Sequence, residues 1–357
     1  MDVTTLESLP IPLGQHGFEE CGGILYAVCG GSEGVEMNRL YAYDPTTGHW
    51  TRKADAPISG QSPVWKAVGG KLYLIGGYRS DLGVKSDETY EYDPSQDSWT
   101  QKADMPHARE DMGGAVVGGK IYIFGGLTNP GHTFASYIDV YNPGTDSWES
   151  RSWFSPVALG DFAAPYGDKI VLVSGTGDMG GYPNDLRATR QVLLYDPALN
   201  SFSSLADCPV AACYKEIDVV GDKLYMIGGA VDGAYDFTGD VQVLDLVQNT
   251  WSVASNVISP NGEMASCVFD GAIYFCGGWL SPGHNDDAFR RLSLAEYVDM
   301  STASGLVLSG TATLTVWSRY GRIIRVADGQ ERSAADAEEG DLVYQTDTKR
   351  FYSRYEE

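Results

Sequence analysis

Positive charge is scarce in this sequence. Its 357 residues include 25 Lys and Arg against 48 Asp and Glu, so the formal net charge at pH 7 is -23. Phosphate backbones and anionic lipid headgroups repel such a surface unless a local basic patch offsets it, and the sequence contains no such patch. The charge balance therefore predicts that the protein binds neither nucleic acid nor an anionic membrane surface.

Long apolar runs are also missing. No stretch approaches the roughly 18 uncharged apolar residues of a membrane-spanning helix. The first residues, MDVTTLESLP, lack the basic flank and the apolar run of an export signal. We therefore expect no membrane insertion and no signal peptide in the chain as given, which leaves its compartment open.

Signatures of metal sites and of common enzymes are absent too. The sequence has no CxxC, P-loop or HExxH pattern. Its five histidines are scattered without an HxH pair, at His16, His49, His107, His132 and His284. Most of its six cysteines lie in or beside apolar strand-like runs, which favours buried thiols over disulfides. We expect neither a metal nor a cofactor.

What the sequence does contain is glycine and aromatic residues in a repeating pattern. There are 43 Gly, 22 Tyr and 8 Trp in a chain long enough to bury a sizeable core. An apolar strand that closes on glycine recurs as KLYLIGG ending at Gly77, KIYIFGG at Gly126, KIVLVSG at Gly175, KLYMIGG at Gly229 and AIYFCGG at Gly278. A less regular copy, ILYAVCGG, has either Gly30 or Gly31 at this place, which makes six repeats.

A second signal follows each glycine motif. It is a strand that ends in a turn, as in Tyr43-Asp44-Pro45 and Tyr92-Asp93-Pro94, with Leu244 as a degenerate form. Seven residues after this aromatic or its substitute come Trp50, Trp99, Trp148, Phe202 and Trp251. With a short apolar run before each glycine motif, every repeat is predicted to contain four strands.

These residues resemble the kelch repeat family, in which a glycine pair, Tyr-Asp-Pro and Trp recur at a period near fifty. The resemblance covers about residues 10 to 300. It implies an all-β fold, a six-bladed kelch-type β-propeller in which each blade is a four-stranded antiparallel sheet around a central channel. Because neighbouring blades would bury each other's faces, we interpret most of the Gly, Tyr and Trp residues as scaffold.

The sixth repeat predicts how the ring closes. Ser304 stands where its outer-strand Trp would be expected, whereas Val3 aligns with the Trp position of the other repeats. Residues 2 to 7 are therefore predicted to form the outermost strand of blade six. The domain boundaries that follow are residues 1–300 for the propeller and 301–357 for a small β-rich extension.

The extension has its own patterns. TATLTVW and LVYQTDTKRFY predict three or four strands, the latter as a hairpin. The segment from Ala334 resembles short segments of bacteriophage tail-fibre and tail-associated proteins, which implies attachment or oligomerisation within a virion or another extracellular assembly. The alternative is a hairpin that packs on the propeller.

Function is predicted in the loops of one propeller face. Loops that join the second to the third strand and loops that join successive blades would lie on the same face, where aromatics alternate with Asp, Asn and Arg. The predicted ligand-binding residues are Trp279, Tyr78, Trp65, Arg109, Glu110, Tyr182, Tyr214, Glu216 and Tyr235. The sequence favours a non-enzymatic binding module for a glycan or a protein partner, because rings beside carboxylates and amides suit both.

Enzymes of the same fold are the alternative. Kelch-like propellers include copper radical oxidases, but their two imidazoles and tyrosinate find no match in the scattered histidines. They also include sialic acid mutarotases, for which Glu110, Asp111, Glu216 or Glu263 with Arg109 could supply acid and base. Kelch adaptors of ubiquitin ligases carry an additional N-terminal region, so that class is less favoured for a chain that starts just before its first repeat.

Overall fold

The computed structural model describes residues 1–32, 35–128, 133–135, 137–152, 161–178, 186–231, 236–281 and 284–294, together with four strands between 314 and 353. These residues form strands and turns and contain no helix, so among them no helix could cross a membrane. The chain divides into two compact units, Val3–Ser293 and Met1–Asp2 with Leu294–Glu357.

The first unit is a set of six four-stranded antiparallel sheets. Blade 1 consists of β2 (Gly17–Cys21), β3 (Ile24–Val28), β6 (Leu40–Asp44) and β7 (His49–Arg52). Blade 2 consists of β8 (Val64–Val68), β9 (Lys71–Ile75), β12 (Thr89–Asp93) and β13 (Ser98–Gln101). Blade 3 consists of β15 (Gly113–Val117), β16 (Lys120–Phe124), β19 (Tyr137–Asn142) and β20 (Ser147–Ser152).

The remaining blades repeat this order. Blade 4 consists of β21 (Asp161–Tyr166), β22 (Lys169–Ser174), β25 (Val192–Asp196) and β26 (Ser201–Ser204). Blade 5 consists of β27 (Glu216–Val220), β28 (Lys223–Ile227), β31 (Val241–Asp245) and β32 (Thr250–Ala254). Blade 6 consists of β33 (Ala265–Phe269), β34 (Ala272–Cys276), β37 (Phe289–Ser293) and β1 (Asp2–Thr5).

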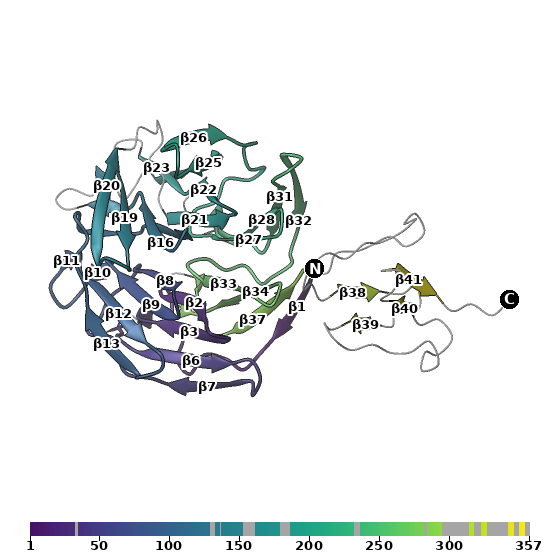
Figure 1. Ribbon diagram of the computed structural model, residues 1–357, viewed down its shortest axis with the longest axis horizontal. Helices are drawn as coiled ribbons and strands as arrows, with labels where there is room; N and C mark the ends of the chain where they lie inside the picture. Colours follow the sequence, from purple (N-terminus) through teal and green to yellow (C-terminus); the bar gives the residue numbers. More distant parts are fainter. Residues whose placement is uncertain are drawn as a thin grey trace. The chain divides into compact units, whose positions relative to one another are not determined.

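Contacts between the innermost strands close these sheets into a ring. β2 contacts β8, β8 contacts β15, and the series continues through β21, β27 and β33 back to β2 (Figure 1). Among the described residues, the apolar core clusters combine side chains of two neighbouring blades, as where Tyr26 of blade 1 packs edge-on against Tyr92 of blade 2. The six-bladed kelch-type propeller predicted from the repeats is confirmed.

The N-terminus supplies the outer strand of blade 6, as the sequence predicted. β1 pairs with β37, and the Leu6 amide donates to the Phe289 carbonyl (2.8 Å). Glu7 then joins this strand to blade 1, because its carbonyl accepts a hydrogen bond from Trp50 Nε1 (3.0 Å). The first residues of the chain thereby link the last blade to the first.

The seven-residue spacing between Tyr and Trp sets the register of the two outer strands. Tyr92 lies directly opposite Trp99 across the β12–β13 pair, and Tyr141 lies opposite Trp148 across β19–β20. Their rings are in contact, with centroids 5.1 and 4.9 Å apart. The interpretation of these aromatics as scaffold is therefore confirmed.

The glycine pairs lie where backbone segments approach closely. Gly77 has φ +94° and a Cβ there would lie 2.6 Å from the Gln61 carbonyl oxygen. In blade 1 the same place is taken by Cys29 and Gly30, with φ of 59° and 88°, so Gly30 rather than Gly31 is the equivalent glycine. All six cysteines are buried free thiols, as the sequence predicted.

A small hairpin follows the second strand of each blade. These hairpins are β4 (Gly31–Ser32) with β5 (Val35–Glu36), β10 (Tyr78–Arg79) with β11 (Val84–Lys85), β17 (Leu127–Thr128) with β18 (Thr133–Phe134), β23 (Thr176–Asp178) with β24 (Leu186–Ala188), β29 (Ala230–Val231) with β30 (Asp236–Phe237), and β35 (Trp279–Ser281) with β36 (His284–Asn285). β14 (Arg109–Glu110) pairs with β17.

The described strands of the C-terminal unit form two antiparallel hairpins. β38 (Leu314–Trp317) pairs with β39 (Ile323–Val326), and β40 (Leu342–Gln345) pairs with β41 (Arg350–Ser353). The hairpin predicted for LVYQTDTKRFY is therefore present, as is the strand within TATLTVW.

Candidate functional site

Two sets of loops lie together at one end of the propeller, as the strand order predicted. In blades 1, 2, 5 and 6 the residue after the glycine motif forms a backbone bridge to the segment that leads into the innermost strand of the same blade. Examples are Tyr78 with Gln61, Ala230 with Cys213 and Trp279 with Gly262. We call this end, formed by the small hairpins and the lead-in segments, the loop face.

The lead-in segments form a ring around the central channel. In the five described lead-in segments one residue stands in the left-handed region with φ between 50° and 56°, namely Gln15, Ser62, Asp111, Tyr214 and Glu263. Their backbones are hydrogen-bonded in sequence, because Glu263 N donates to Tyr214 O (2.9 Å), Gln15 N to Glu263 O (3.2 Å) and Ser62 N to Gln15 O (2.9 Å). These five residues line a cavity of about 110 Å³, which we call the channel mouth.

A second cavity of about 170 Å³ continues from the mouth between the innermost strands. His16, Met112 and Glu216 line both cavities. The deeper one adds Lys66 from β8 and Asp218 from β27. Charged side chains therefore face a narrow space in the centre of the ring.

Three carboxyl groups in this space are held in a poorly solvated setting. Burial, reinforced by the neighbouring Asp218 charge, raises the pKa of Glu216 to about 8, against weaker opposing effects of Ser266 and Lys66. Burial raises the pKa of Asp218 to about 7 and, together with Asp111, that of Glu263 to about 8. These carboxyls consequently titrate near neutral pH, where most carboxyls are fully ionised.

His16 is a neutral histidine beside a neutral thiol. Its ring is 7% exposed, and Nε2 lies 3.3 Å from Cys276 Sγ. Burial lowers the pKa of His16 to about 3 and raises the pKa of Cys276 well above its usual value. Because neither group is charged, the pair is not an activated nucleophile.

The two aromatics that sequence placed directly after glycine pairs are on the loop face. Tyr78 and Trp279 are both partly exposed. Their backbones are fixed, since Tyr78 N donates to Gln61 O (2.9 Å) and Trp279 N donates to Gly262 O (2.7 Å). The Trp279 indole also packs so closely on Gly14 of blade 1 that a Cβ there would clash with it.

Trp65 and Arg109, two predicted ligand-binding residues, are buried. Trp65 is 3% exposed and packs against Trp99, with ring centroids 5.7 Å apart. Arg109 is 0% exposed, donates to Asp139 Oδ2 (2.7 Å) and lies over the Tyr137 ring. Both side chains therefore belong to the interior packing of the propeller, Trp65 from β8 and Arg109 from β14.

The other predicted residues divide by position. Tyr214 lies at the channel mouth and Glu216 in both cavities. Glu110 is largely buried, with Oε1 3.5 Å from Lys85 Nζ. Tyr182 and Tyr235 lie outside the described residues.

Sequence reasoning missed Gln15, His16, Ser62, Lys66 and Asp218 as residues of the central cavities. A positional signal was available for the mouth: each of its residues stands 15 positions before the second glycine of its repeat, as Ser62 does before Gly77. Within the described residues, no three His, Cys, Asp or Glu side chains are grouped to hold a metal ion.

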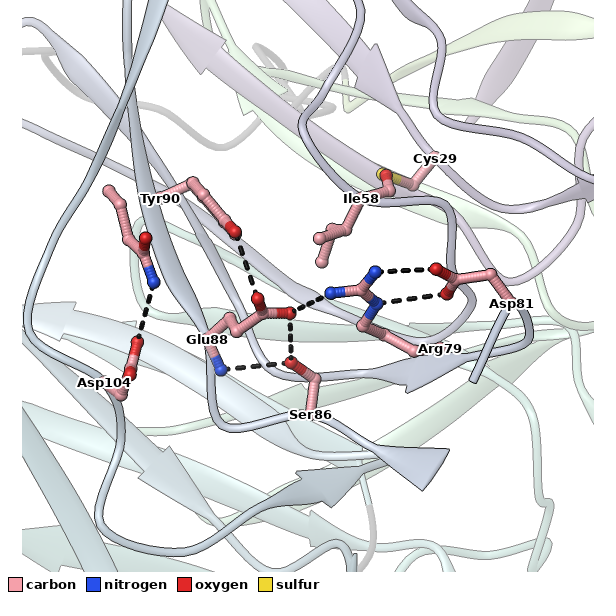
Figure 2. A network of polar contacts seen from close by, with 9 residues as sticks. Cys29, Ile58, Arg79, Asp81, Ser86, Glu88, Tyr90 and Asp104 are labelled. Atoms are coloured by element: carbon pink, nitrogen blue, oxygen red, sulfur yellow. Dashed lines mark hydrogen bonds and ion pairs between the residues drawn. The ribbon is translucent and has the colours of Figure 1, made fainter. Parts of the chain in front are cut away.

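Arg79 of the loop face is bound by neighbouring carboxylates. Arg79 forms a bidentate pair with Asp81 (3.1 and 2.6 Å), and its Nη1 also donates to Glu88 (2.7 Å), as Figure 2 shows. Glu88 in turn accepts hydrogen bonds from Ser86 (3.2 Å) and Tyr90 (3.1 Å). This network holds the loop between β10 and β12 in a defined conformation.

Comparison with known proteins gives consistent matches over the propeller. A model of the KLHDC2/KLHL20/DRC7 Kelch-repeats domain matches residues 65–278, and a Kelch motif model matches residues 12–57. Neither match extends into residues 301–357.

Curated relatives match over shorter stretches. An F-box/kelch-repeat protein of Arabidopsis thaliana is 32% identical over 99 residues, which are 28% of this chain and 23% of that protein. Mouse Kelch-like protein 35 is 29% identical over 113 residues, which are 32% of this chain and 20% of that protein. The chain thus spans about a quarter or less of the length of these relatives.

Among solved structures, that of YjhT is similar over 79% of this chain and 95% of its own, with a TM-score of 0.68 and 17% sequence identity. At this identity the likeness concerns the fold.

Proposed function

This chain belongs to the kelch-repeat family, and from that premise we propose that it is a binding module that holds a protein partner on the loop face of its propeller. The observation that carries the proposal is the rigid placement of partly exposed Tyr78, Tyr214 and Trp279 around the channel mouth. Aromatic side chains on an ordered backbone bind with little loss of conformational entropy, which is typical of interface residues.

Peptide and glycan arrays test this function. We expect the protein to bind peptides, and we expect Trp279→Ala and Tyr78→Ala to weaken that binding at least about tenfold, as for interface anchors. Leu199→Ala and Val247→Ala serve as controls, because these exposed side chains lie in the turns between the third and fourth strands of their blades, away from the loop face. Peptide binding that survives both aromatic substitutions would contradict the proposal.

A glycan is the alternative ligand of the same face. Partly exposed rings beside amide groups, such as Trp279 near Asn285 and Tyr78 bridged to Gln61, suit a sugar ring as well as a peptide. The glycan arm of the array distinguishes the two: selective glycan binding that Trp279→Ala abolishes would replace the protein partner with a carbohydrate.

One observation favours a second function, a sugar-modifying activity of the mutarotase type. The pKa values of Glu216 and Glu263, raised to about 8, suit general acid–base chemistry near neutral pH. Catalysed anomer exchange of a free sugar, followed by NMR and lost in Glu216→Gln, would support this activity, and exchange at the uncatalysed rate would exclude it for the sugars tested.

We also propose residues 301–357 as an attachment or oligomerisation module, on the strength of their resemblance to phage tail segments. In that case the propeller would serve as a receptor-binding component of a virion or extracellular assembly. Light scattering on the full chain and on residues 1–300 tests this module, and equal protomer counts at high concentration would contradict oligomerisation through it.

A further inference from the structure

Carboxyl groups outnumber cations in the described lining of the two central cavities. Asp111, Glu216, Asp218 and Glu263 line these cavities, and among the described residues the lysines that line them are Lys66 and Lys215.

Lys66 is shared among several carboxyl groups. Its Nζ lies 2.8 Å from Oε2 of a further carboxylate, Glu19. Its charge also opposes the rise in the pKa of Glu216 and of Asp218. One lysine thus faces three carboxyl groups at the centre of the ring.

Buried polar atoms in the same space lack hydrogen-bond partners among the described residues. They are Oδ2 of Asp218 and Nδ1 of His16, whose side chain is more than nine-tenths buried. A buried polar atom without a partner costs free energy that a bound group can recover. His16 lines both cavities, so this observation points to the same place as the carboxyl groups without depending on them.

Two arginines of the propeller are already bound to carboxylates. Arg79 is held by Asp81 and Glu88, and Arg290 by Asp286 (2.9 Å). Their guanidinium groups therefore balance carboxylates other than those that line the two cavities.

We propose that the channel mouth binds the guanidinium or ammonium group of an Arg or Lys side chain that a protein partner inserts from the loop face. The inference rests on the proposed function and names the chemistry of its partner. Glu216, Asp218 and Glu263 accept hydrogen bonds from the inserted cation, and His16 lies beside it. Ionic hydrogen bonds of this kind are about twice as strong as neutral ones.

The size of the space favours a single side chain. Pockets for drug-sized ligands measure roughly 300–1,000 Å³, whereas these adjoining cavities measure about 170 and 110 Å³. A long side chain with a charged tip fits such a space, with its aliphatic stem against Met112 and Phe162. A metal ion is less favoured, because the described side chains present no group of three ligands.

Calorimetry with N-acetyl-arginine methylamide, the lysine analogue and the citrulline analogue tests the proposal. Citrulline has nearly the shape of arginine without its charge. We expect the arginine or lysine probe to bind at least about tenfold more tightly than citrulline, which corresponds to about 1.4 kcal/mol. Equal binding of the charged and neutral probes, or no binding of either cation at millimolar concentration, would overturn the proposal.

Variants locate the binding. Glu216→Gln with Glu263→Gln should weaken cation binding at least tenfold, whereas Asp168→Asn and Glu149→Gln, exposed carboxyls away from the channel, should leave it unchanged. The Gln variants are expected to fold, because the folded state already favours the protonated carboxyls. Binding that the channel variants retain would overturn the site.

The same experiment distinguishes a partner's side chain from a small solute as the source of the cation. Probes with blocked ends represent a side chain within a peptide, whereas free arginine and methylammonium represent small solutes. Tighter binding of the small solutes would overturn insertion of a partner's side chain. Should peptides on the array bind through Trp279 and Tyr78 while no cation binds the channel, the proposed function stands and this inference fails.

Discussion

Glu216, Asp218 and Glu263 make the stability of the propeller depend on pH. Their pKa values in the folded protein, about 8, 7 and 8, lie well above the usual carboxyl range. Between about pH 6.5 and 8.5 the unfolded chain has ionised these groups, while the folded chain still binds protons there. The free energy of unfolding therefore decreases as pH rises through this window.

We expect the melting temperature to fall by a few degrees from pH 6.5 to pH 8.5, measured by calorimetry at constant ionic strength. His16 acts in the opposite direction only at lower pH, because its lowered pKa matters below the usual histidine value of 6.5. In the double variant Glu216→Gln with Glu263→Gln the slope should flatten. A wild-type melting temperature that rises with pH across this window would show that the carboxyls are ionised in the folded state.

Gly77 illustrates a residue that both conformation and space require. Its φ of +94° is unfavourable for other residues, and its Cβ would approach the Gln61 carbonyl and Pro63. Gly70 also has positive φ, +76°, but open space at its Cβ. Gly77→Ala should therefore destabilise the protein by about 2 kcal/mol more than Gly70→Ala, measured by urea unfolding. Equal losses would show that the crowded position relaxes without cost.

At the scale of the element, the outer hairpins of blades 2, 3 and 5 hold the preceding blade. Trp99 Nε1 donates to the Ala54 carbonyl (2.9 Å), and Ala54 N donates to Asp97 Oδ1 (2.8 Å), which also accepts from Tyr92 (2.7 Å). Trp148 and Trp251 make the same contact with Ala103 and Ala206, both at 2.8 Å. The Tyr and Trp of one hairpin thus act across a blade boundary.

Trp99→Phe should remove this hydrogen bond and keep most of the aromatic packing. We expect a loss of about 1 kcal/mol in the free energy of unfolding, because the Ala54 carbonyl loses its donor at a partly buried site. Phe202 occupies the equivalent place in blade 4, so the ring shape is acceptable to the fold. An unchanged unfolding curve would mean that water replaces the indole donor fully.

Sequence spacing predicted the register of these outer hairpins, but not the residues of the neighbouring blade that they contact. Seven residues from Tyr to Trp fit a strand end, a turn and a strand start, so the register follows from local geometry. That the indole would reach a carbonyl 45 positions earlier in the chain depends on how neighbouring blades are stacked. The assignment of Gly30 over Gly31 required the same information, because both glycines satisfy the local pattern.

Closure of the ring is a property of the whole propeller. β1 completes blade 6, and Glu7 accepts hydrogen bonds from both the amide (3.0 Å) and the indole (3.0 Å) of Trp50 in blade 1. Deletion of residues 1–8 should lower the melting temperature by several degrees, because it exposes the edge of β37 and removes this junction. Calorimetry measures the effect, and an unchanged melting temperature would refute the closure as a source of stability.

The sequence alone determined that the chain forms a six-bladed kelch propeller with an N-terminal closing strand. Its repeat spacing, glycine pairs and aromatic positions encode the strands of each blade locally. Because one blade cannot bury its own faces, the repeats have to pack against one another. Sequence also placed Tyr78, Trp279 and Tyr214 on the loop face. It could not separate Trp65 and Arg109, which are buried, from residues at the mouth, because burial depends on packing that the local pattern does not show. Only the tertiary structure added His16 and Asp218 to Glu216 and Glu263, since the channel exists only once six innermost strands surround one axis.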